Sequence, residues 1–66
     1  LNCEALETLN LSNWNIANVG YQSDMFKYCY TLKTIIMRNC DARTIRTIKA
    51  ALTEAGIQNN VSIITE

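Results

Sequence analysis

Apolar residues recur at every second position in three short stretches of this chain. Alternation with a period of two is typical of a β-strand that buries one face. The chain therefore predicts three strands. They fall in residues 7–11, 34–38 and 58–65. Their inward apolar positions are Leu9 and Leu11, Ile35 and Met37, and Val61 and Ile63.

The period changes after the second strand. Between Asp41 and Gly56, apolar residues recur at spacings of three and four, which indicates an amphipathic helix with one buried side. Asp41 suits the N-cap position and Gly56 the left-handed position after the last turn. We expect a regular helix over about residues 41–55. Its expected inward residues are Ala42, Ile45, Ile48, Leu52 and Ala55.

The segment after the first strand is less regular. Residues 12–20 are rich in turn-forming residues, mainly asparagine, which favours a loop. Its apolar residues are expected to insert into the core, and they are Trp14, Ile16 and Val19. Ser23 is expected to cap a short helical turn over residues 24–28, with Met25 and Phe26 facing inward.

The chain contains an internal repeat. Residues 3–9 are answered by residues 29–35 at the same spacing of apolar positions. A repeat of this length predicts one structural unit used several times, and the crossovers between strands imply parallel pairing. Equivalent residues should then stack at about 4.8 Å. Applying the same offset again gives the expected ladders Leu9–Ile35–Val61 and Leu11–Met37–Ile63.

These elements predict one α/β domain over residues 1–66. The first repeat covers about residues 3–28, the second about 29–56, and a terminal strand about 58–65. The three parallel strands are joined by one irregular crossover and one regular helix. Because stacked repeats form extended surfaces, the default role is to hold a partner.

Length and charge limit the function classes. The 66 residues carry six basic and six acidic side chains and no histidine. A neutral chain offers no electrostatic basis for binding nucleic acid or a membrane surface. No apolar run approaches the roughly 20 residues that cross a bilayer. The small size and the abrupt start at Leu1 favour a fragment of a longer protein.

A more specific pattern resembles the leucine-rich repeats. Leu6-x-x-Leu9-x-Leu11 and Leu32-x-x-Ile35-x-Met37-x-x-Cys40 fit that signature. Between them, the order Leu-Ser-x-Trp, Asn-Val, and Met-Phe-x-x-Cys-x-x-Leu is similar to the BspA-like repeats of bacterial surface proteins. The match covers about residues 3–40. The chain departs from the family at Gln22, where methionine is favoured, and in the regular helix after Cys40.

The resemblance implies a fragment of a leucine-rich-repeat solenoid that ends in an atypical closing repeat. It also implies a non-catalytic, adhesion-type protein-interaction module at the bacterial cell surface or in the extracellular space. The alternative is a purely structural solenoid-capping segment with no ligand of its own. Its open N-terminal repeat edge would then favour a homodimer joined at that edge.

The outward residues of the strands are the candidate partner-binding site. In a solenoid they share one concave sheet face, and polar residues around two isoleucines suit modest protein binding. The alternative is that they are ordinary solvated strand residues. The candidates are Thr8, Asn10, Ser12, Thr34, Ile36, Arg38, Asn60, Ser62 and Ile64.

The three cysteines invite a disulfide, a metal site or catalysis. Cys3 and Cys29 occupy the same repeat position, within the range that a disulfide spans. Because stacked side chains point the same way, we expect buried thiols instead. Cys40 is expected to satisfy backbone groups of its turn. Without a histidine base, a small redox or metal enzyme is the least favoured alternative, and no cofactor is expected.

The remaining charged and aromatic residues have structural explanations. Glu7 and Lys33 occupy equivalent positions and are expected to form an ion pair between adjacent strands. The basic residues of the helix are expected on its solvated face, and they are Arg43, Arg46 and Lys49. Trp14 is expected to fill the core. The tyrosines, whose places the repeat pattern leaves open, are Tyr21, Tyr28 and Tyr30.

Overall fold

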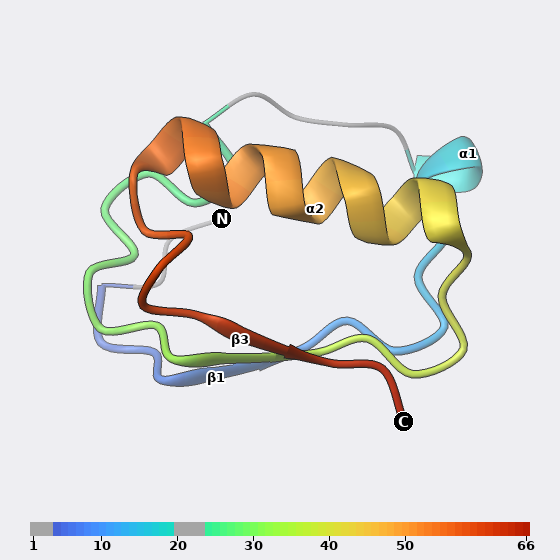
Figure 1. Cartoon of the computed structure of the whole chain (residues 1–66), viewed down its shortest axis with the longest axis horizontal. Helices are drawn as coiled ribbons and strands as arrows, with labels where there is room; N and C mark the ends of the chain where they lie inside the picture. The colour runs from blue at the N-terminus through green and yellow to red at the C-terminus, as the bar shows by residue number, and fades with distance from the viewer. Residues whose placement is uncertain (1–3, 20–23) are drawn as a thin grey trace.

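The computed structural model describes residues 4–19 and 24–66 (Figure 1). Its elements are β1 (Thr8–Asn10), α1 (Ile16–Val19), β2 (Thr34–Ile36), α2 (Ala42–Ala55) and β3 (Ser62–Ile64). The three strands form one open parallel sheet in the order β1-β2-β3. The α/β class and the three parallel strands are therefore confirmed. The expectations for Cys3, Tyr21 and the Ser23 cap lie outside the described residues.

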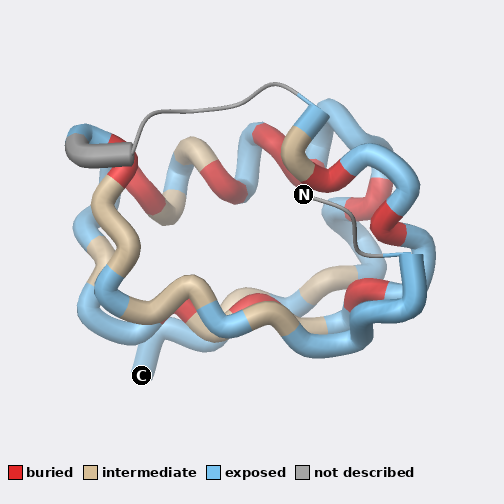
Figure 2. The backbone as a smooth tube through the Cα atoms, turned by 180° about the vertical axis from the view of Figure 1, so that it is seen from behind, coloured by how far each residue is buried: buried red, intermediate tan, exposed pale blue. Residues whose placement is uncertain are grey.

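The molecule has two layers, with α2 lying over one face of the sheet and α1 beside the first turns of α2 (Figure 1). The buried residues lie on α2, on the sheet and in the turns that join them (Figure 2), and they pack together in one core cluster. This arrangement leaves the opposite face of the sheet without a covering element among the described residues. The core residues are Phe26, Cys29, Leu32, Ile35, Met37, Ile48, Ala51, Leu52 and Ile57.

The strand register confirms one step of the expected ladders and corrects the other. Leu9 pairs with Ile35 as expected, but Ile35 pairs with Ile63 and not with Val61. Strand β3 thus pairs with β2 two positions later in the sequence than the repeat offset predicts. The reason is that the full helix α2 joins β2 to β3, whereas an irregular crossover joins β1 to β2. A shift of two positions keeps every side chain on its face, so Val61 still packs against the core.

The second expected ladder changes for the same reason. The backbone N–H of Leu11 donates to the Ile36 carbonyl at 2.7 Å, which continues the register that pairs Leu9 with Ile35. The backbone N–H of Met37 donates to the Ile64 carbonyl at 2.7 Å. On the side that faces β3, Met37 therefore follows the shifted register. Ile63 belongs to the ladder of Leu9 and Ile35.

Helix α2 begins and ends where its caps predict. The Asp41 side chain accepts a hydrogen bond from the Thr44 backbone N–H at 2.7 Å. Gly56 has φ +78° and donates its N–H to the carbonyls of Leu52 and Thr53. Only glycine adopts this left-handed conformation without steric cost. The expected helix over residues 41–55 is confirmed.

The buried side of α2 is rotated from the expected one. Ala42 and Ala55 are exposed and Ile45 is half-buried, whereas Thr44 is fully buried at 0% exposure. A buried hydroxyl must find a hydrogen-bond partner, and Thr44 accepts one from the Ile16 backbone N–H. The buried residues of α2 are Thr44, Ile48, Ala51 and Leu52.

The first crossover contains a helical turn where a loop was expected. Asn15 accepts a hydrogen bond from the Ala17 N–H at 2.9 Å, so its side chain caps the start of α1. Ile16 is buried and Trp14 is half-buried against the core, as expected. The side chain of Val19 lies outside the described residues.

Residues 24–28 form successive turns instead of the expected helical turn. Asp24 and Tyr28 have φ values of +65° and +67°, and a left-handed residue interrupts a right-handed helix. Phe26 nevertheless points inward and is 1% exposed. Met25 is half-buried against the core, so the expected inward pair is confirmed.

The two strand-to-crossover turns have the same geometry. Asn13 and Asn39 are both left-handed, with φ +68° and +57°. The Asn39 side-chain amide donates to Asn13 Oδ1 at 2.8 Å, and the half-buried free thiol of Cys40 donates to the Leu11 carbonyl at 3.3 Å. The expected role of Cys40 is confirmed, and successive coils are structurally equivalent at this corner.

Cys29 differs from its expected chemistry. It is buried, at 1% exposure, and it is disulfide-bonded. The expectation of a buried thiol is therefore right for its burial and wrong for its oxidation state.

The expected ion pair between adjacent coils is present. Lys33 Nζ lies 3.3 Å from Glu7 Oε1, and both side chains are mostly exposed. An exposed pair of this kind stabilises a fold by about 0–1 kcal/mol. It supports the register of β1 and β2 and forms no site.

Candidate partner-binding surfaces

The candidate residues on the strands form two rows on the uncovered face of the sheet, which we call the outer face. The register places Thr8 beside Thr34 and Thr34 beside Ser62, and it places Asn10, Ile36 and Ile64 in the next row. These six residues come together as expected.

The remaining three candidates lie at the two ends of the strands. Ser12 Oγ accepts the backbone N–H of Arg38 at 3.0 Å, and Arg38 Nε donates to the Glu66 carbonyl at 2.7 Å. Asn60 lies in the turn before β3 and not in a strand, because of the shifted register. It lines a shallow hollow together with Tyr30 and Ser62.

The two rows of the outer face carry no charged side chain. Ile36 is half-buried, and Ile64, its neighbour in the register, is 38% exposed. The adjoining row carries only hydroxyl groups. A small apolar centre with polar surroundings can bury a partner's apolar side chain and hydrogen-bond its backbone.

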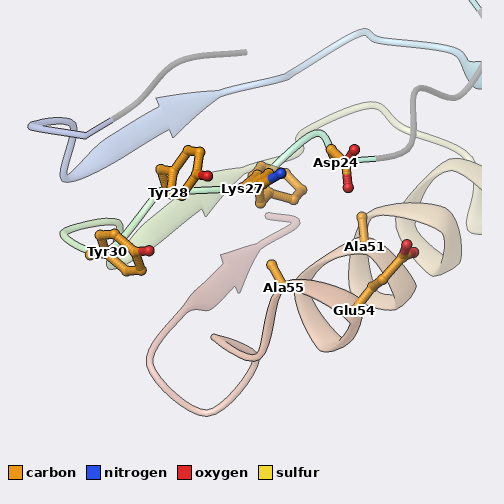
Figure 3. Close-up of a pocket in the computed structure, with 8 residues that line it drawn as sticks. Asp24, Lys27, Tyr28, Tyr30, Ala51, Glu54 and Ala55 are labelled. Atoms are coloured by element: carbon orange, nitrogen blue, oxygen red, sulfur yellow. The ribbon is translucent and has the colours of Figure 1, made fainter.

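A concave pocket of about 320 Å³ lies between the turns of residues 24–30 and the last turns of α2, and we call it the helix-end pocket (Figure 3). Helix α2 ends here because of the Gly56 cap. The turns lie close to the end of α2 because the side chain of Phe26 is buried in the core. The lining residues are Asp24, Phe26, Lys27, Tyr28, Tyr30, Ala51, Glu54 and Ala55.

Two tyrosines form the aromatic side of the helix-end pocket. The ring centroids of Tyr28 and Tyr30 lie 6.1 Å apart with an interplanar angle of 64°, an edge-to-face arrangement. Both rings are well exposed, at 52% and 74%. Lys27 Nζ lies 5.3 Å from the Tyr28 ring centroid, a cation–π distance.

Helix α2 forms the opposite side of the pocket. Ala51 and Ala55 turn their short side chains toward the turns, and Glu54 extends from the same helix (Figure 3). Phe26 and Ala51 are buried and close the base. Small residues on α2 leave the space that the tyrosines border.

The sequence interpretation did not find the helix-end pocket. The available signal was the pair of tyrosines on either side of Cys29, outside the apolar repeat positions. Such rings have no core slot, so they must lie at the surface. Trp14 is half-buried against the core, and the core-filling expectation is confirmed.

A second groove of about 490 Å³ runs between α2 and β3. Its apolar base is Leu52, Val61 and Ile63, and polar side chains surround that base. On α2, the basic residues Arg43, Arg46 and Lys49 are all exposed, which confirms the expected solvated helix face.

The described residues contain no group of three histidine, cysteine, aspartate or glutamate side chains placed to hold a metal ion. Among the same residues, no helix has the length and apolar character needed to cross a membrane.

Comparison of the chain with protein-family models, with curated proteins and with solved structures found no match.

Proposed function

We propose that this chain is part of a leucine-rich-repeat solenoid of the BspA-like type and serves as a non-catalytic, adhesion-type protein-interaction module. Its outer face binds a protein ligand at the bacterial cell surface or in the extracellular space. The chain contributes coils to an extended binding surface and closes one end of it.

The repetition of one coil geometry carries this proposal. Leu9 and Ile35 are stacked in register, and the corners at Asn13 and Asn39 share a left-handed conformation joined by a hydrogen bond. Coils that stack in this way form the extended sheets that repeat proteins use to bind partners.

The outer face supports a protein as the ligand. Ile36 and Ile64 adjoin across β2 and β3, and their neighbours in the register are uncharged. Contact with a partner would remove this apolar area from water, while the adjacent hydroxyl groups can hydrogen-bond the partner's backbone.

The oxidation state of Cys29 supports an extracellular location. Disulfides persist in oxidising compartments, including the cell surface, and are rare in the cytosol. A disulfide-bonded Cys29 therefore fits an exported protein.

Binding of the fluorescently labelled chain to intact epithelial and bacterial cells tests the proposal. We expect saturable binding that trypsin treatment of the cells abolishes, because the ligand is a protein. The double variant Ile36→Glu, Ile64→Glu should lose this binding, because it places two charges at the apolar centre of the outer face.

Arg46→Glu provides the control, because it alters an exposed residue of α2 away from the outer face. It should bind cells as the parent chain does. The absence of saturable binding to either cell type, or equal binding by the double variant, would contradict the proposed role.

A purely structural closing segment is the second candidate, and one asymmetry favours it. Leu6 is 36% exposed and Leu11 is half-buried, whereas Leu32 and Met37, their equivalents in the second coil, are at most 1% exposed. The register that pairs Ile35 with Ile63 gives the third coil polar residues at these positions. They are Asn60 and Thr65.

In this alternative, one end of the stack is closed by polar residues, and the other end presents an apolar edge along β1. A second copy would cover that edge in a two-fold arrangement, because the polar end does not complement it. Sedimentation at increasing concentration should show a monomer–dimer equilibrium that Leu11→Lys shifts toward the monomer. A monomer at every concentration would exclude this homodimer.

A further inference from the structure

We propose that the free edge of β3 and the groove between α2 and β3 bind an extended segment of a partner protein, which adds a strand to the sheet. The segment carries one aliphatic side chain and a carboxylate two residues away from it. This inference goes beyond the outer-face function, because it concerns a different surface of the chain.

Strand β3 lies at the edge of the sheet (Figure 1). Toward β2, the Ser62 N–H donates to the Lys33 carbonyl at 2.8 Å, and the Ile64 carbonyl accepts from β2 as well. Because successive residues of a strand direct their backbone groups to opposite sides, the N–H and carbonyl of Ile63 point away from β2. Among the described residues, no strand pairs with β3 on that side. An edge of this kind is a template for one more strand.

The groove between α2 and β3 gives an added strand a place for its side chains. Its volume is about 490 Å³, and its apolar base consists of Leu52, Val61 and Ile63. Residues opposite each other in adjacent strands point to the same face, as Leu9, Ile35 and Ile63 do here. The residue of an added strand opposite Ile63 therefore points into the groove. An aliphatic side chain at that position covers Val61 and Ile63, which are only half-buried in the chain alone.

The charge of the groove favours an acidic segment. Among the described residues that line it, Lys49 alone is charged. Lys49 is exposed, and within the described part of the chain no carboxylate forms an ion pair with it. Side chains two residues apart in a strand share one face. A carboxylate two residues from the aliphatic side chain therefore also points toward the groove, where it approaches the ammonium group.

The polar residues of the third coil favour a single segment over another repeat coil. A further coil would bury Asn60 and Thr65, just as Leu32 and Met37 are buried at the equivalent positions of the second coil. Burying polar side chains without partners costs free energy. A short extended segment centred on Ile63 leaves Asn60 in contact with water, so this surface suits a peptide better than a stacked second copy.

Nuclear magnetic resonance titration of the whole chain tests the inference. The probe is the peptide acetyl-Glu-Thr-Ile-Thr-Glu-amide, whose side chains have the same order in both directions, so it fits a parallel or an antiparallel strand. We expect saturable binding that shifts the Ile63 amide proton downfield and slows its exchange with water. The Ser62 amide, which already donates to β2, should change much less.

The matched control is the same peptide N-methylated at its three central residues. It keeps the side chains and the charges but lacks the N–H donors of an added strand. We expect no saturable binding of this control. The affinity of the unmodified probe should fall as salt is raised, because the contact with Lys49 is exposed.

Substitutions then place the peptide on the chain. Lys49→Gln should weaken binding about two- to fivefold, the range expected for one exposed ionic contact. Arg46→Gln makes the same charge change outside the groove lining and should leave the affinity unchanged. Ile36→Glu, on the outer face of β2, should retain peptide binding, which separates this test from that of the outer face.

A second pair of variants tests the backbone contact. Thr65 lies two residues from Ile63, so its N–H points to the same free edge. Thr65→Pro removes that donor and should weaken binding about two- to tenfold, the range expected for one hydrogen bond. Thr65→Ala keeps the N–H and should lose less affinity than Thr65→Pro.

Four results would overturn the inference. The first is the absence of saturable binding by the probe. The second is equal binding of the N-methylated control, since backbone hydrogen bonds would then be irrelevant. The third is a loss of affinity in Arg46→Gln as large as in Lys49→Gln, since the attraction would then be nonspecific. The fourth is self-association of the chain in sedimentation that Thr65→Pro abolishes, since a second copy would then occupy the edge.

Discussion

The Thr44 hydroxyl accepts a hydrogen bond from the Ile16 backbone N–H at 3.1 Å. This contact joins two residues that are distant in the sequence and links the start of α1 to the first turn of α2. Thr44 is fully buried, so water cannot replace the bond. One hydroxyl thereby fixes how the irregular crossover packs against the regular helix.

Thr44→Val should destabilise the fold by about 1–3 kcal/mol, because it keeps the shape of the side chain and leaves the buried Ile16 N–H without a partner. Urea denaturation followed by circular dichroism measures this free energy of unfolding. Thr44→Ser retains the hydroxyl and should lose less than Thr44→Val. Equal losses would show that packing of the methyl group, and not the hydrogen bond, determines the effect.

Ile48→Asp should abolish cooperative folding. Ile48 is 0% exposed in the core between α2 and the sheet, and an unpaired buried charge costs several kcal/mol. Arg46→Glu, on the exposed side of the same helix, should change stability by no more than about 0.5 kcal/mol. Thermal melts of both variants check this contrast, and an unchanged melting temperature for Ile48→Asp would contradict the assigned buried side of α2.

Asp41 makes the stability depend on acid pH. Hydrogen bonds from the Thr44 hydroxyl and then from its backbone N–H lower the pKa of Asp41 below its ordinary value of 3.8, and the charges of Arg43 and Arg46 add to this effect. Because the pKa is lower in the folded state, the stabilisation is complete above pH 3.8 and is lost as the pH falls through the folded value.

Asp41→Asn should therefore flatten the acid limb of the stability profile while changing stability little at neutral pH, since asparagine is also a good N-cap. Urea denaturation at several pH values from strongly acid to neutral measures the slope. A variant whose stability fell with acid as steeply as that of the parent would show that other carboxylates control this limb.

The two described cysteines should differ in reactivity. In unfolded, non-reduced protein, iodoacetamide should label Cys40, which is a free thiol, and should leave Cys29 unlabelled, because it is disulfide-bonded. After reduction, both should react. Peptide mass mapping distinguishes the two sites, and labelling of Cys29 without reductant would restore the expectation of a buried thiol.

Local signals allowed α2 to be predicted well. Asp41 and Gly56 act on the backbone of their own helix, so their effect can be read without knowledge of distant contacts. Leu9 and Ile35 were also placed correctly, because the repeat offset that relates them is visible in the sequence.

Properties that depend on distant contacts were not predictable in the same way. The burial of Thr44 depends on α1, which lies far earlier in the chain, and a threonine at a helical position looks polar in isolation. The helix-end pocket depends on left-handed turns at Asp24 and Tyr28. Aspartate is among the residue types that adopt this conformation more often, but tyrosine is not, and a single aspartate is too weak a signal to predict it.

The displacement of Ile63 by two positions has a consequence for finding relatives of this chain. Each repeat runs from one strand to the next, and its length is set by the segment that connects the two strands. The repeat from Ile35 to Ile63 contains a regular helix. It is longer than the repeat from Leu9 to Ile35, which contains an irregular crossover. A search with a rigid spacing would miss coils of the longer kind, so the spacing should be allowed to vary in steps of two.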